Sequence, residues 1–420
     1  MSEHLHSGEK VAAGQRALPT ESAQAFAATQ AAWRFYANDA VTLPILAEPL
    51  KAYAEEALRE SKAKYALAVH DWSHLKYSTH ESKTDRKLLS NKRELGYLLQ
   101  TALLVDSITG TPIAPLVQSV TFADGQHTTL SESVEPEESV LDGLTTAMKA
   151  VEQIQLDALM VHIVDREADS VWHFRHWGQE GLRFVVRADD QRIVRHDGVE
   201  RKLPEVASLL GPEMKFSRIV EYKGRKAWQY VAETTVILER PAVTHRVIDG
   251  VRERQRIPGQ PLALRLVVSE VRDESSQVLS LWLLLTNVTG VPASEIALWY
   301  YWRWSIESYF KLLKSAGHQA EQWQQESAAA IAKRLLVTAM ACVVVWQTAR
   351  STEPEAAEFR QVLVKLSGRQ MKHKCQFTEP AMLAGLNILL PMLNLLEHYD
   401  LQHIKELASS CLPGVFPLRR

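Results

Sequence analysis

Five short apolar runs, separated by turn residues and by stretches with helical spacing, constrain the fold of this chain more than any other feature. Each run has the composition that favours a β-strand. The runs are Tyr65–His70, Leu95–Val105, Pro112–Phe122, Leu159–Val164 and Phe184–Arg187. Helical spacing over Val140–Gln155 and Glu167–Gln179 separates the last three. The order strand, hairpin, helix, strand, helix, strand predicts a mixed α/β domain.

The segments before and after this α/β region have other patterns. Residues 1–20 are polar and lack an apolar period, which predicts a flexible tail, and residues 21–62 predict two helices, the second over about Leu46–Ser61. In residues 192–290, Val and Thr alternate with charged residues, which predicts an antiparallel β-rich segment that ends in a strand at Val278–Leu285. The remainder of the chain has helical spacing almost to its end.

Composition is that of a folded cytoplasmic protein. Of the 420 residues, 46% are hydrophobic and 23% are charged, which excludes intrinsic disorder as the main state. Three scattered cysteines do not suit a disulfide scaffold, so a reducing cytoplasm is expected. The apolar stretch near Leu335–Trp346 is too short to span a bilayer and predicts a buried helix. The N-terminus lacks the layout of a signal peptide, and no membrane contact is expected.

The net charge of −2 hides an uneven distribution. Residues 181–260 carry 16 basic and 11 acidic side chains, whereas the rest of the chain carries 32 basic and 39 acidic ones. A locally basic surface attracts phosphate groups even on a nearly neutral protein. An exposed sheet also needs charged side chains, and composition alone leaves both explanations open.

Two aspartates follow predicted strands. Asp71 comes directly after Tyr65–His70, and Asp165 comes directly after Leu159–Val164. Ligands of open α/β sheets gather at the carboxyl ends of the strands, and paired carboxylates there suit Mg²⁺ or Mn²⁺. For either aspartate alone, a role as a turn residue or helix N-cap is the commoner explanation.

A third feature combines aromatic and charged residues at helical spacing. The segment 299–317 reads WYYWRWSIESYFKLLKSAG, and its Tyr300, Arg303, Glu307 and Lys314 fall on one face of a single helix. A solvated face with ion pairs four residues apart would explain the charges. It would not explain the density of aromatic residues, which indicates a functional face.

Together these features resemble the DDE transposases of bacterial insertion sequences, in the branch called insertion-sequence family four. The resemblance rests on Asp71 in HDWS, Asp165 in VDREAD and a Tyr-x2-Arg-x3-Glu-x6-Lys signature that begins at Tyr300, and it covers roughly residues 30–350. It implies an RNase H-like core in which a β-rich insertion separates the last catalytic helix from the strands.

The resemblance divides the chain into five segments. A tail and N-terminal helical DNA-binding region are expected at 1–62, the first part of the core at 63–191, the insertion at 192–290, the helix with the catalytic glutamate at 291–325, and a C-terminal helical dimerisation region at 326–420. In the last segment, residues 381–396 are apolar on more than one face, and Pro391 predicts two short helices there. The alternative is that these leucines pack only within the same chain.

The resemblance also implies a role for each site residue. The catalytic residues and metal ligands would be Asp71, Asp165 and Glu307, which would hold two Mg²⁺ or Mn²⁺ ions. The residues that contact phosphates near the cleaved end would be Tyr300, Arg303, Lys311 and Lys314. Trp282 would stack on a base flipped out of the DNA, and Arg187 would approach the DNA at the same edge. Without the resemblance, Trp282 is better explained as a core aromatic, and a surface ion pair explains Arg187 equally well.

The function that the resemblance implies is transposition. The protein would cleave DNA at transposon ends and transfer the strands into target DNA, through a hairpin intermediate and without a covalent protein–DNA bond. Because two ends must be held together, a homodimer on double-stranded DNA is expected. The expected location is the bacterial cytoplasm, at the nucleoid.

The sequence leaves two other functions open. A non-catalytic or truncated relative that binds DNA or inhibits an active transposase would fit the short region before Asp71, whereas the presence of every catalytic residue favours an active enzyme. A glycoside hydrolase also uses carboxylates at strand ends, but it would not explain Arg303 and Lys314 beside Glu307.

Overall fold

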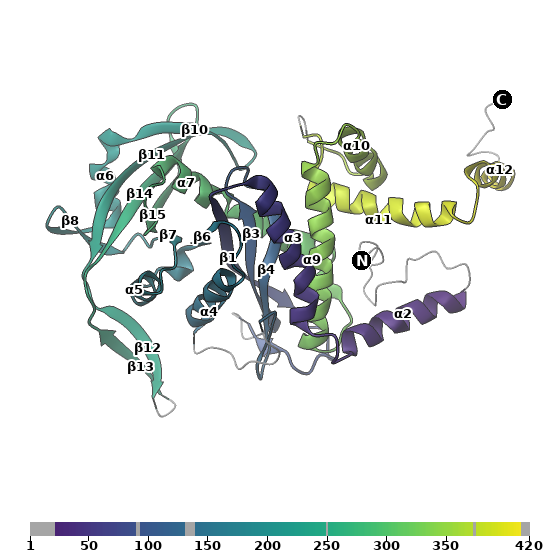
Figure 1. The fold of residues 1–420 in the computed structure, drawn as a ribbon, viewed down its shortest axis with the longest axis horizontal. Coiled ribbons are helices and arrows are strands. Elements are labelled where there is room, and N and C mark those ends of the chain that lie inside the picture. Colours follow the sequence, from purple (N-terminus) through teal and green to yellow (C-terminus); the bar gives the residue numbers. More distant parts are fainter. Residues whose placement is uncertain (1–21, 90–92, 131–138, 249–250, 373–374, 413–420) are drawn as a thin grey trace. The chain divides into compact units, whose positions relative to one another are not determined.

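The computed structural model describes residues 22–89, 93–130, 139–248, 251–372 and 375–412, so the tail expected at 1–20 lies outside the described residues. The chain forms two compact units, whose helices and strands are drawn in Figure 1. The helical unit consists of Met1–Leu46, Leu75–Tyr97 and Tyr309–Arg420, and the sheet unit consists of Ala47–His74 and Leu98–Ser308.

The five predicted strands lie in one mixed sheet (Figure 1). They are β1 (Tyr65–Lys76), β3 (Leu95–Asp106), β4 (Pro112–Thr121), β6 (Leu159–Val164) and β7 (Phe184–Arg187). Their order is β4-β3-β1-β6-β7, with β3 and β4 antiparallel and with β6 parallel to both β1 and β7. The helix α4 (Val140–Gln153) precedes β6, and α5 (Val171–Gln179) joins β6 to β7. The predicted α/β class is confirmed.

Strand β1 is longer than the sequence predicts. The apolar run ends before Asp71, but the strand continues to Lys76. Beyond Asp71 the side chains still alternate, and Ser73 and Leu75 are buried, so one face of the strand keeps its packing. Asp71 therefore lies within a strand rather than in a turn after it.

The antiparallel β-rich segment predicted at 192–290 is confirmed, and it extends the same sheet. Its strands are β8 (Ile193–His196), β9 (Val199–Lys202), β10 (Lys215–Tyr222), β11 (Arg225–Leu238), β12 (Ala242–Ile248), β13 (Val251–Ile257), β14 (Leu262–Arg272) and β15 (Val278–Thr286). The last of these is the strand predicted at Val278–Leu285, and it pairs antiparallel with β7. From there the order continues β15-β14-β11-β8-β9, with β10 on β11 and with β12 and β13 as a separate pair.

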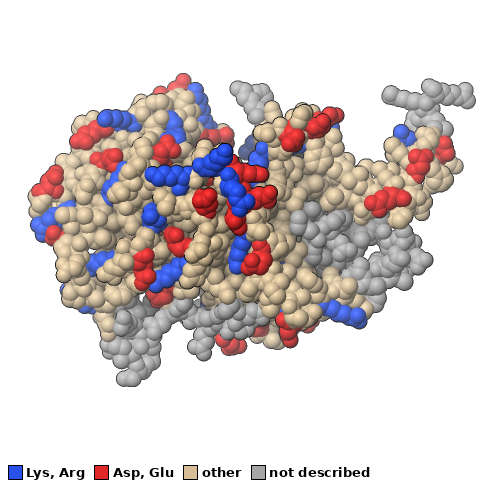
Figure 2. All heavy atoms as spheres, in the orientation of Figure 1, with Lys and Arg blue, Asp and Glu red and all other residues tan. Residues whose placement is uncertain are grey.

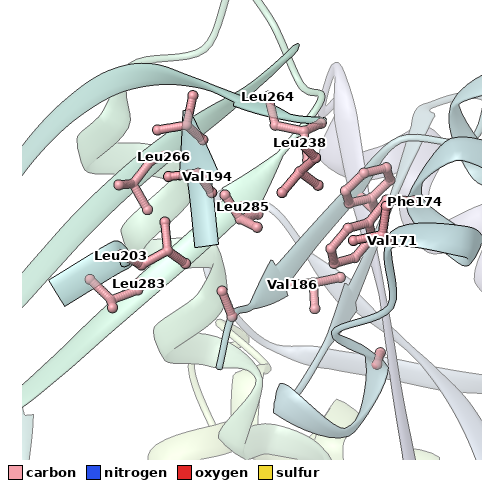
Figure 3. Close-up of a cluster of buried hydrophobic side chains, with 14 of the residues drawn as sticks. Val171, Phe174, Val186, Val194, Leu203, Leu238, Leu264, Leu266, Leu283 and Leu285 are labelled. Atoms are coloured by element: carbon pink, nitrogen blue, oxygen red, sulfur yellow. The ribbon is translucent and has the colours of Figure 1, made fainter. Parts of the chain in front are cut away.

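One hydrophobic core joins the α/β strands to the inserted strands (Figure 3). Phe174 of α5 and Val186 of β7 pack in the same cluster as Leu264 of β14 and Leu283 and Leu285 of β15. Each of these side chains is at most 2% exposed, and burying a side chain of this size stabilises a fold by about 1.5–3 kcal/mol. The insertion therefore shares its core with the strands that carry the aspartates.

The helical unit contains the predicted terminal helices. They are α2 (Ser22–Ala37), the start of α3 (Leu43–Ser61), the end of α8 (Trp304–Leu313), α9 (Ala328–Arg350), α10 (Ala356–Ser367), α11 (Glu379–Leu396) and α12 (Leu401–Cys411). The helix predicted to be buried around Leu335–Trp346 is α9, and the prediction is confirmed. Asp85 caps α9, because its Oδ2 accepts a hydrogen bond from the N–H of Ala328 at 2.7 Å.

The prediction that Pro391 divides the C-terminal apolar segment is wrong. The helix α11 is continuous from Glu379 to Leu396, with Pro391 inside it. A proline within a helix removes one backbone hydrogen bond. The part of α11 that is buried, Ala381–Leu386, lies before Pro391, and the helix packs against α9 and α10.

Among the described residues, two helices are long and apolar enough to cross a membrane by length and composition alone. In α9, 78% of the apolar window is buried inside the protein, as in the core helix of a soluble protein. In α11 the buried share is 28%, because side chains such as Ile388, Met392 and Leu393 are exposed. The burial of α9 is consistent with the expected soluble protein.

Candidate active site

Asp71 and Asp165 lie side by side because their strands are neighbours. The strands β1 and β6 run parallel with Val69 opposite Ile163, and each aspartate follows its member of that pair by two residues. Side chains two residues apart on a strand lie on the same face, so both carboxylates leave the sheet at the same level. The structure therefore brings together the two aspartates that the sequence predicts as a pair.

The two carboxylates share one guanidinium group. Nη1 of Arg303 donates a hydrogen bond to Oδ2 of Asp71 at 3.1 Å, and Nη2 lies 3.3 Å from Oδ2 of Asp165. Arg303 is only 8% exposed, so this cation is largely shielded from water. The guanidinium stands in for the positive charge that two adjacent carboxylates require.

Asp165 binds further partners through its other oxygen. Oδ1 accepts hydrogen bonds from the hydroxyl of Tyr300 at 3.0 Å and from the backbone N–H of Arg166 at 2.7 Å, and it lies 3.8 Å from Nη1 of Arg187. The bond from Arg166 caps the short 3₁₀ helix η1 (Arg166–Ala168). Asp165 is thus an N-cap through Oδ1, and it still presents Oδ2 to Arg303.

The surroundings shift the pKa values of the two aspartates in opposite directions. Burial raises the pKa of Asp71 to about 6, and the negative charge of Glu307 adds to this rise. Burial acts in the same direction on Asp165, but Arg303, the capping N–H and Tyr300 outweigh it and lower the pKa of Asp165 below its usual value. Asp165 is therefore the more firmly ionised member of the pair.

The sequence predicts that the signature residues lie on one continuous helix, and this prediction is wrong. The helix α7 (Ala293–Trp302) ends at Trp302 with Arg303 as its C-cap, and α8 begins at Trp304. Arg303 donates its N–H to the carbonyl of Tyr300, three residues back, so the turn is tighter than an α-helical turn. The interruption falls at the residue whose side chain is bonded to Asp71. Lys314 follows the last residue of α8.

Glu307 lies in the first turn of α8, one turn beyond Arg303. It is half-buried, and its charge raises the pKa of both Asp71 and Arg303, which places it within electrostatic range of the pair. Within the described part of the chain, no group of three or more His, Cys, Asp or Glu side chains is gathered closely enough to hold a metal ion. The structure thus brings the two aspartates together through Arg303 and places Glu307 near them.

Lys311 and Lys314 belong to the helical unit, whereas the other predicted site residues belong to the sheet unit. Lys311 is exposed, and Nζ of Lys314 lies 3.9 Å from Oε1 of Glu321. Their contact with the same phosphates as Arg303 stays a prediction.

A cavity of about 620 Å³ opens next to Arg303 in the sheet unit. Its walls combine aromatic rings with basic groups. They include Tyr222, Trp282, Tyr300, Tyr301, Trp302 and Trp304, together with Arg187, Lys223 and Arg303. Nucleic acid strands bind to such walls, because bases stack on rings and phosphates pair with cations.

Trp282 on β15 is a half-buried wall of this cavity. Its ring meets the ring of Tyr300 edge to face, with centroids 5.5 Å apart, and lies near Tyr301. Trp282 also packs against the buried cluster of Val220, Ala227 and Val271, so it is in part the core aromatic that the alternative describes and in part a wall of the cavity. Its stacking on a DNA base stays a prediction.

Sequence reasoning missed several cavity residues. Tyr301, Trp302 and Trp304 lie within the aromatic segment 299–317, and its density of rings is the signal that could have identified them. Tyr222 and Lys223 come from the turn between β10 and β11, which no local motif connects with the aspartates. Tyr222 and Lys223 reach the wall because β10 pairs with β11 and because Tyr301 donates a hydrogen bond to Glu221, next to Tyr222.

Surface charge does not separate into large single-sign regions on the face drawn in Figure 2, where basic and acidic side chains lie intermixed. The basic excess of residues 181–260 is therefore not one broad basic patch on that face. Any anion-binding site on this face would therefore be a small group of basic side chains rather than a broad basic surface.

A scan against models of protein families and a search of curated proteins both find no match to this chain. Its function is therefore inferred from the residues and their geometry.

Proposed function

We propose that the chain is a DDE transposase, a metal-dependent DNA nuclease and strand transferase that acts at transposon ends. One observation carries the proposal: two aspartates on adjacent parallel strands share the guanidinium of Arg303 beside a cavity walled by rings and cations. A core or turn role for Asp71 and Asp165 would not require a buried arginine between them.

The strand order supports an RNase H-like core. Such a core has three antiparallel strands followed by two parallel ones in the order 3-2-1-4-5, and β4-β3-β1-β6-β7 has this order with α5 in the corresponding crossover. The backbone N–H of Tyr77 donates a hydrogen bond to the carbonyl of Leu95, and the hydroxyl of Ser107 donates one to the carbonyl of Tyr65. The end of β1 therefore lies beside the start of β3, and the start of β1 beside the end of β3, so the two strands are antiparallel. The β-rich insertion enters after β7 and returns before α7, as the resemblance implies.

The donor set fits Mg²⁺ or Mn²⁺. Carboxylate oxygens are the donors that these ions prefer, and Asp71 and Asp165 already share one cation through their Oδ2 atoms. The ions would be held by Asp71 and Asp165 together with Glu307 of α8. When bound, the metals activate a water or 3′-hydroxyl and stabilise the leaving oxygen.

The chain's own residues orient the site and the DNA. Tyr300 and the capping N–H of Arg166 hold Asp165 in one orientation, because both bond to its Oδ1. Arg187 offers a guanidinium group that pairs with phosphates through two donors. Both Nη atoms of Arg303 contact the two aspartates, so Arg303 would pair with a phosphate only when metal ions take its place there. Trp282 presents a ring on which an unpaired base stacks, which would stabilise a hairpin intermediate.

The partners follow from this activity. The substrates are double-stranded DNA with transposon ends and target DNA, and two chains are needed to hold two ends. The protein would act at the nucleoid in the bacterial cytoplasm.

The test is cleavage of DNA that carries the genomic flanks of the gene. We expect the purified protein to cut this DNA only with Mg²⁺ or Mn²⁺, and Glu307→Gln to abolish cutting while it leaves DNA binding largely intact. Glu274→Gln, at an exposed turn of the same unit, is the matched control and should cut normally. Full cleavage by Glu307→Gln would refute its role, and DNA binding without cleavage by the unmodified protein would identify a non-catalytic relative.

A further inference from the structure

A basic hairpin stands at the rim of the cavity. Strands β10 and β11 are joined by a two-residue turn, and residues 215–230 carry five basic side chains and one acidic side chain. Three of the basic ones, Lys223, Arg225 and Lys226, lie in or next to the turn and are exposed. We call these three residues the basic tip.

The turn holds a lysine in a backbone conformation that lysine rarely adopts. Tyr222 pairs with Arg225, and the two residues between them have positive φ, 52° at Lys223 and 76° at Gly224. Two-residue hairpin turns of this kind favour Asn-Gly, because Asn tolerates positive φ better than other side chains. A lysine here retains a charge at the cost of backbone strain, which points to a use for the charge.

The hairpin is fixed to the helix that carries Tyr300. The hydroxyl of Tyr301 on α7 donates a hydrogen bond to the carbonyl of Glu221 at 2.6 Å. In the middle of β10, Nη2 of Arg218 lies 2.9 Å from Oε1 of Glu295 on the same helix. Two anchors on one helix set the position of the basic tip relative to the cavity.

The basic tip meets the cavity directly. Tyr222 and Lys223 are part of the cavity wall, on the rim next to Trp282 and Tyr301. Nζ of Lys223 lies 5.3 Å from the ring centroid of Tyr222, on the same hairpin. Among the described residues none of the three tip cations forms an ion pair, so their charges face solvent.

We propose that the basic tip binds the phosphate backbone of duplex DNA whose end reaches the cavity. This inference rests on the proposed function, and it assigns a DNA contact to residues outside the signature. Three cations within four successive residues, fixed beside a ring-walled cavity, match the repeated charges of a phosphate backbone.

The test measures DNA affinity at several salt concentrations. The probe is a fluorescein-labelled duplex of arbitrary sequence, about three helical turns long, and the readout is fluorescence anisotropy. The variant combines Lys223→Asn, Arg225→Gln and Lys226→Gln in the full chain. Asn suits the turn conformation, so we expect the melting temperature to be unchanged or slightly raised.

The matched control is Lys215→Gln, an exposed lysine at the opposite end of β10. We expect the triple variant to bind roughly tenfold more weakly, and the slope of log affinity against log salt to fall by about 0.9 for each phosphate that the variant no longer neutralises. Lys215→Gln should bind like the unmodified protein.

Two results would overturn the proposal, and they differ in what else they overturn. If the unmodified protein binds the duplex and the triple variant matches Lys215→Gln in affinity and slope, the basic tip does not contact DNA, and the proposed function stands. If the unmodified protein binds no duplex at all, both proposals fail.

Discussion

Arg303 donates a hydrogen bond from Nη1 to Oδ2 of Asp71 at 3.1 Å, across 232 residues of chain. The same guanidinium lies 3.3 Å from Oδ2 of Asp165. The carboxylates that would bind Mg²⁺ are thus paired with a side chain of the protein itself. A bound metal would therefore compete with Arg303 for the same two oxygens.

Replacing Arg303 with Met should make stability depend on metal. Without a cation, Asp71 and Asp165 face each other as like charges, so we expect unfolding in EDTA to need roughly 1.5–3 kcal/mol less free energy, the range for hydrogen bonds to charged groups. Mg²⁺ should restore much of this stability, since it supplies the missing charge. Urea unfolding with EDTA and with Mg²⁺ measures both effects.

The control for this prediction is Arg303→Lys, which keeps the charge and removes the forked geometry. It should lose less stability in EDTA than Arg303→Met. Equal stability of Arg303→Met and the unmodified protein in EDTA would contradict the bridging role.

Asp71 should make the metal-free protein less stable as pH rises. Burial raises the pKa of Asp71 to about 6 in the folded protein, above its usual value, so the folded state holds a proton that the unfolded chain has released. The free energy of unfolding should therefore fall as pH rises from about 4 to about 6, and this contribution should level off above that range.

Asp71→Asn should remove this contribution, because the amide does not titrate. Urea unfolding in EDTA between pH 4 and 7, compared between Asp71→Asn and the unmodified protein, isolates the effect. Parallel pH curves for the two proteins would show that Asp71 titrates at its usual value.

Trp282 should contribute to DNA binding through its ring. Trp282→Ala should weaken binding to a DNA hairpin with an unpaired base by about 1–3 kcal/mol, the range for base stacking on an aromatic side chain. Trp282→Phe should weaken it less. Competition binding with a fully paired duplex of the same length is the control, since that duplex offers no base to the ring.

The apolar surface of α11 should pair two chains on DNA. Ile388, Met392, Leu393 and Leu396 are between 40% and 48% exposed, which is more apolar surface than a solvated helix usually presents. Deleting residues 380–420 should leave binding of single DNA ends and prevent their pairing. Gel shifts with ends of two lengths measure pairing through a complex of intermediate mobility. Unchanged paired complexes would place the dimer interface elsewhere.

Gly110 should tolerate no side chain. Its φ of 72° favours glycine, and a Cβ there would lie 2.3 Å from Cε2 of Trp302. Gly110→Ala should therefore cost the strain of the left-handed backbone, about 1 kcal/mol, and a further 1–3 kcal/mol for the overlap. Gly198→Ala, with φ of 76° and no atom within 4 Å, is the control and should cost only the strain. Equal decreases in unfolding free energy would contradict the close approach of Trp302.

Much of the sheet could be predicted from the sequence because its strands are short, apolar and separated by clear turns. Asp71 lies beside Asp165 because each follows an apolar run, Tyr65–His70 and Leu159–Val164, and these two runs pair in parallel with Tyr65 opposite Leu159. The length of β1 could not be predicted, because the two positions buried beyond Asp71 are Ser73 and Leu75, and only one of them is apolar. The alternation is therefore present in burial but not in the hydrophobic pattern of the sequence.

The interior of the site was less accessible to sequence reasoning. Helical spacing correctly places Arg303 one turn before Glu307. It does not indicate that the guanidinium contacts both aspartates or that the helix is interrupted there. That outcome depends on interactions between segments far apart in the chain. The same holds for Lys223, whose position depends on the pairing of β10 with β11 and on the anchor at Tyr301.

The pairing of β7 with β15 has a consequence for how such a protein can change over evolution. Val185 and Thr286 are register partners, so the inserted segment that begins after β7 ends in the strand that pairs with β7. Turns within the inserted segment, such as the one at Ser276, can then lengthen or shorten without displacing the ends of that segment. New surface residues can arise there by insertion and deletion, while Asp71 and Asp165 keep their places beside each other.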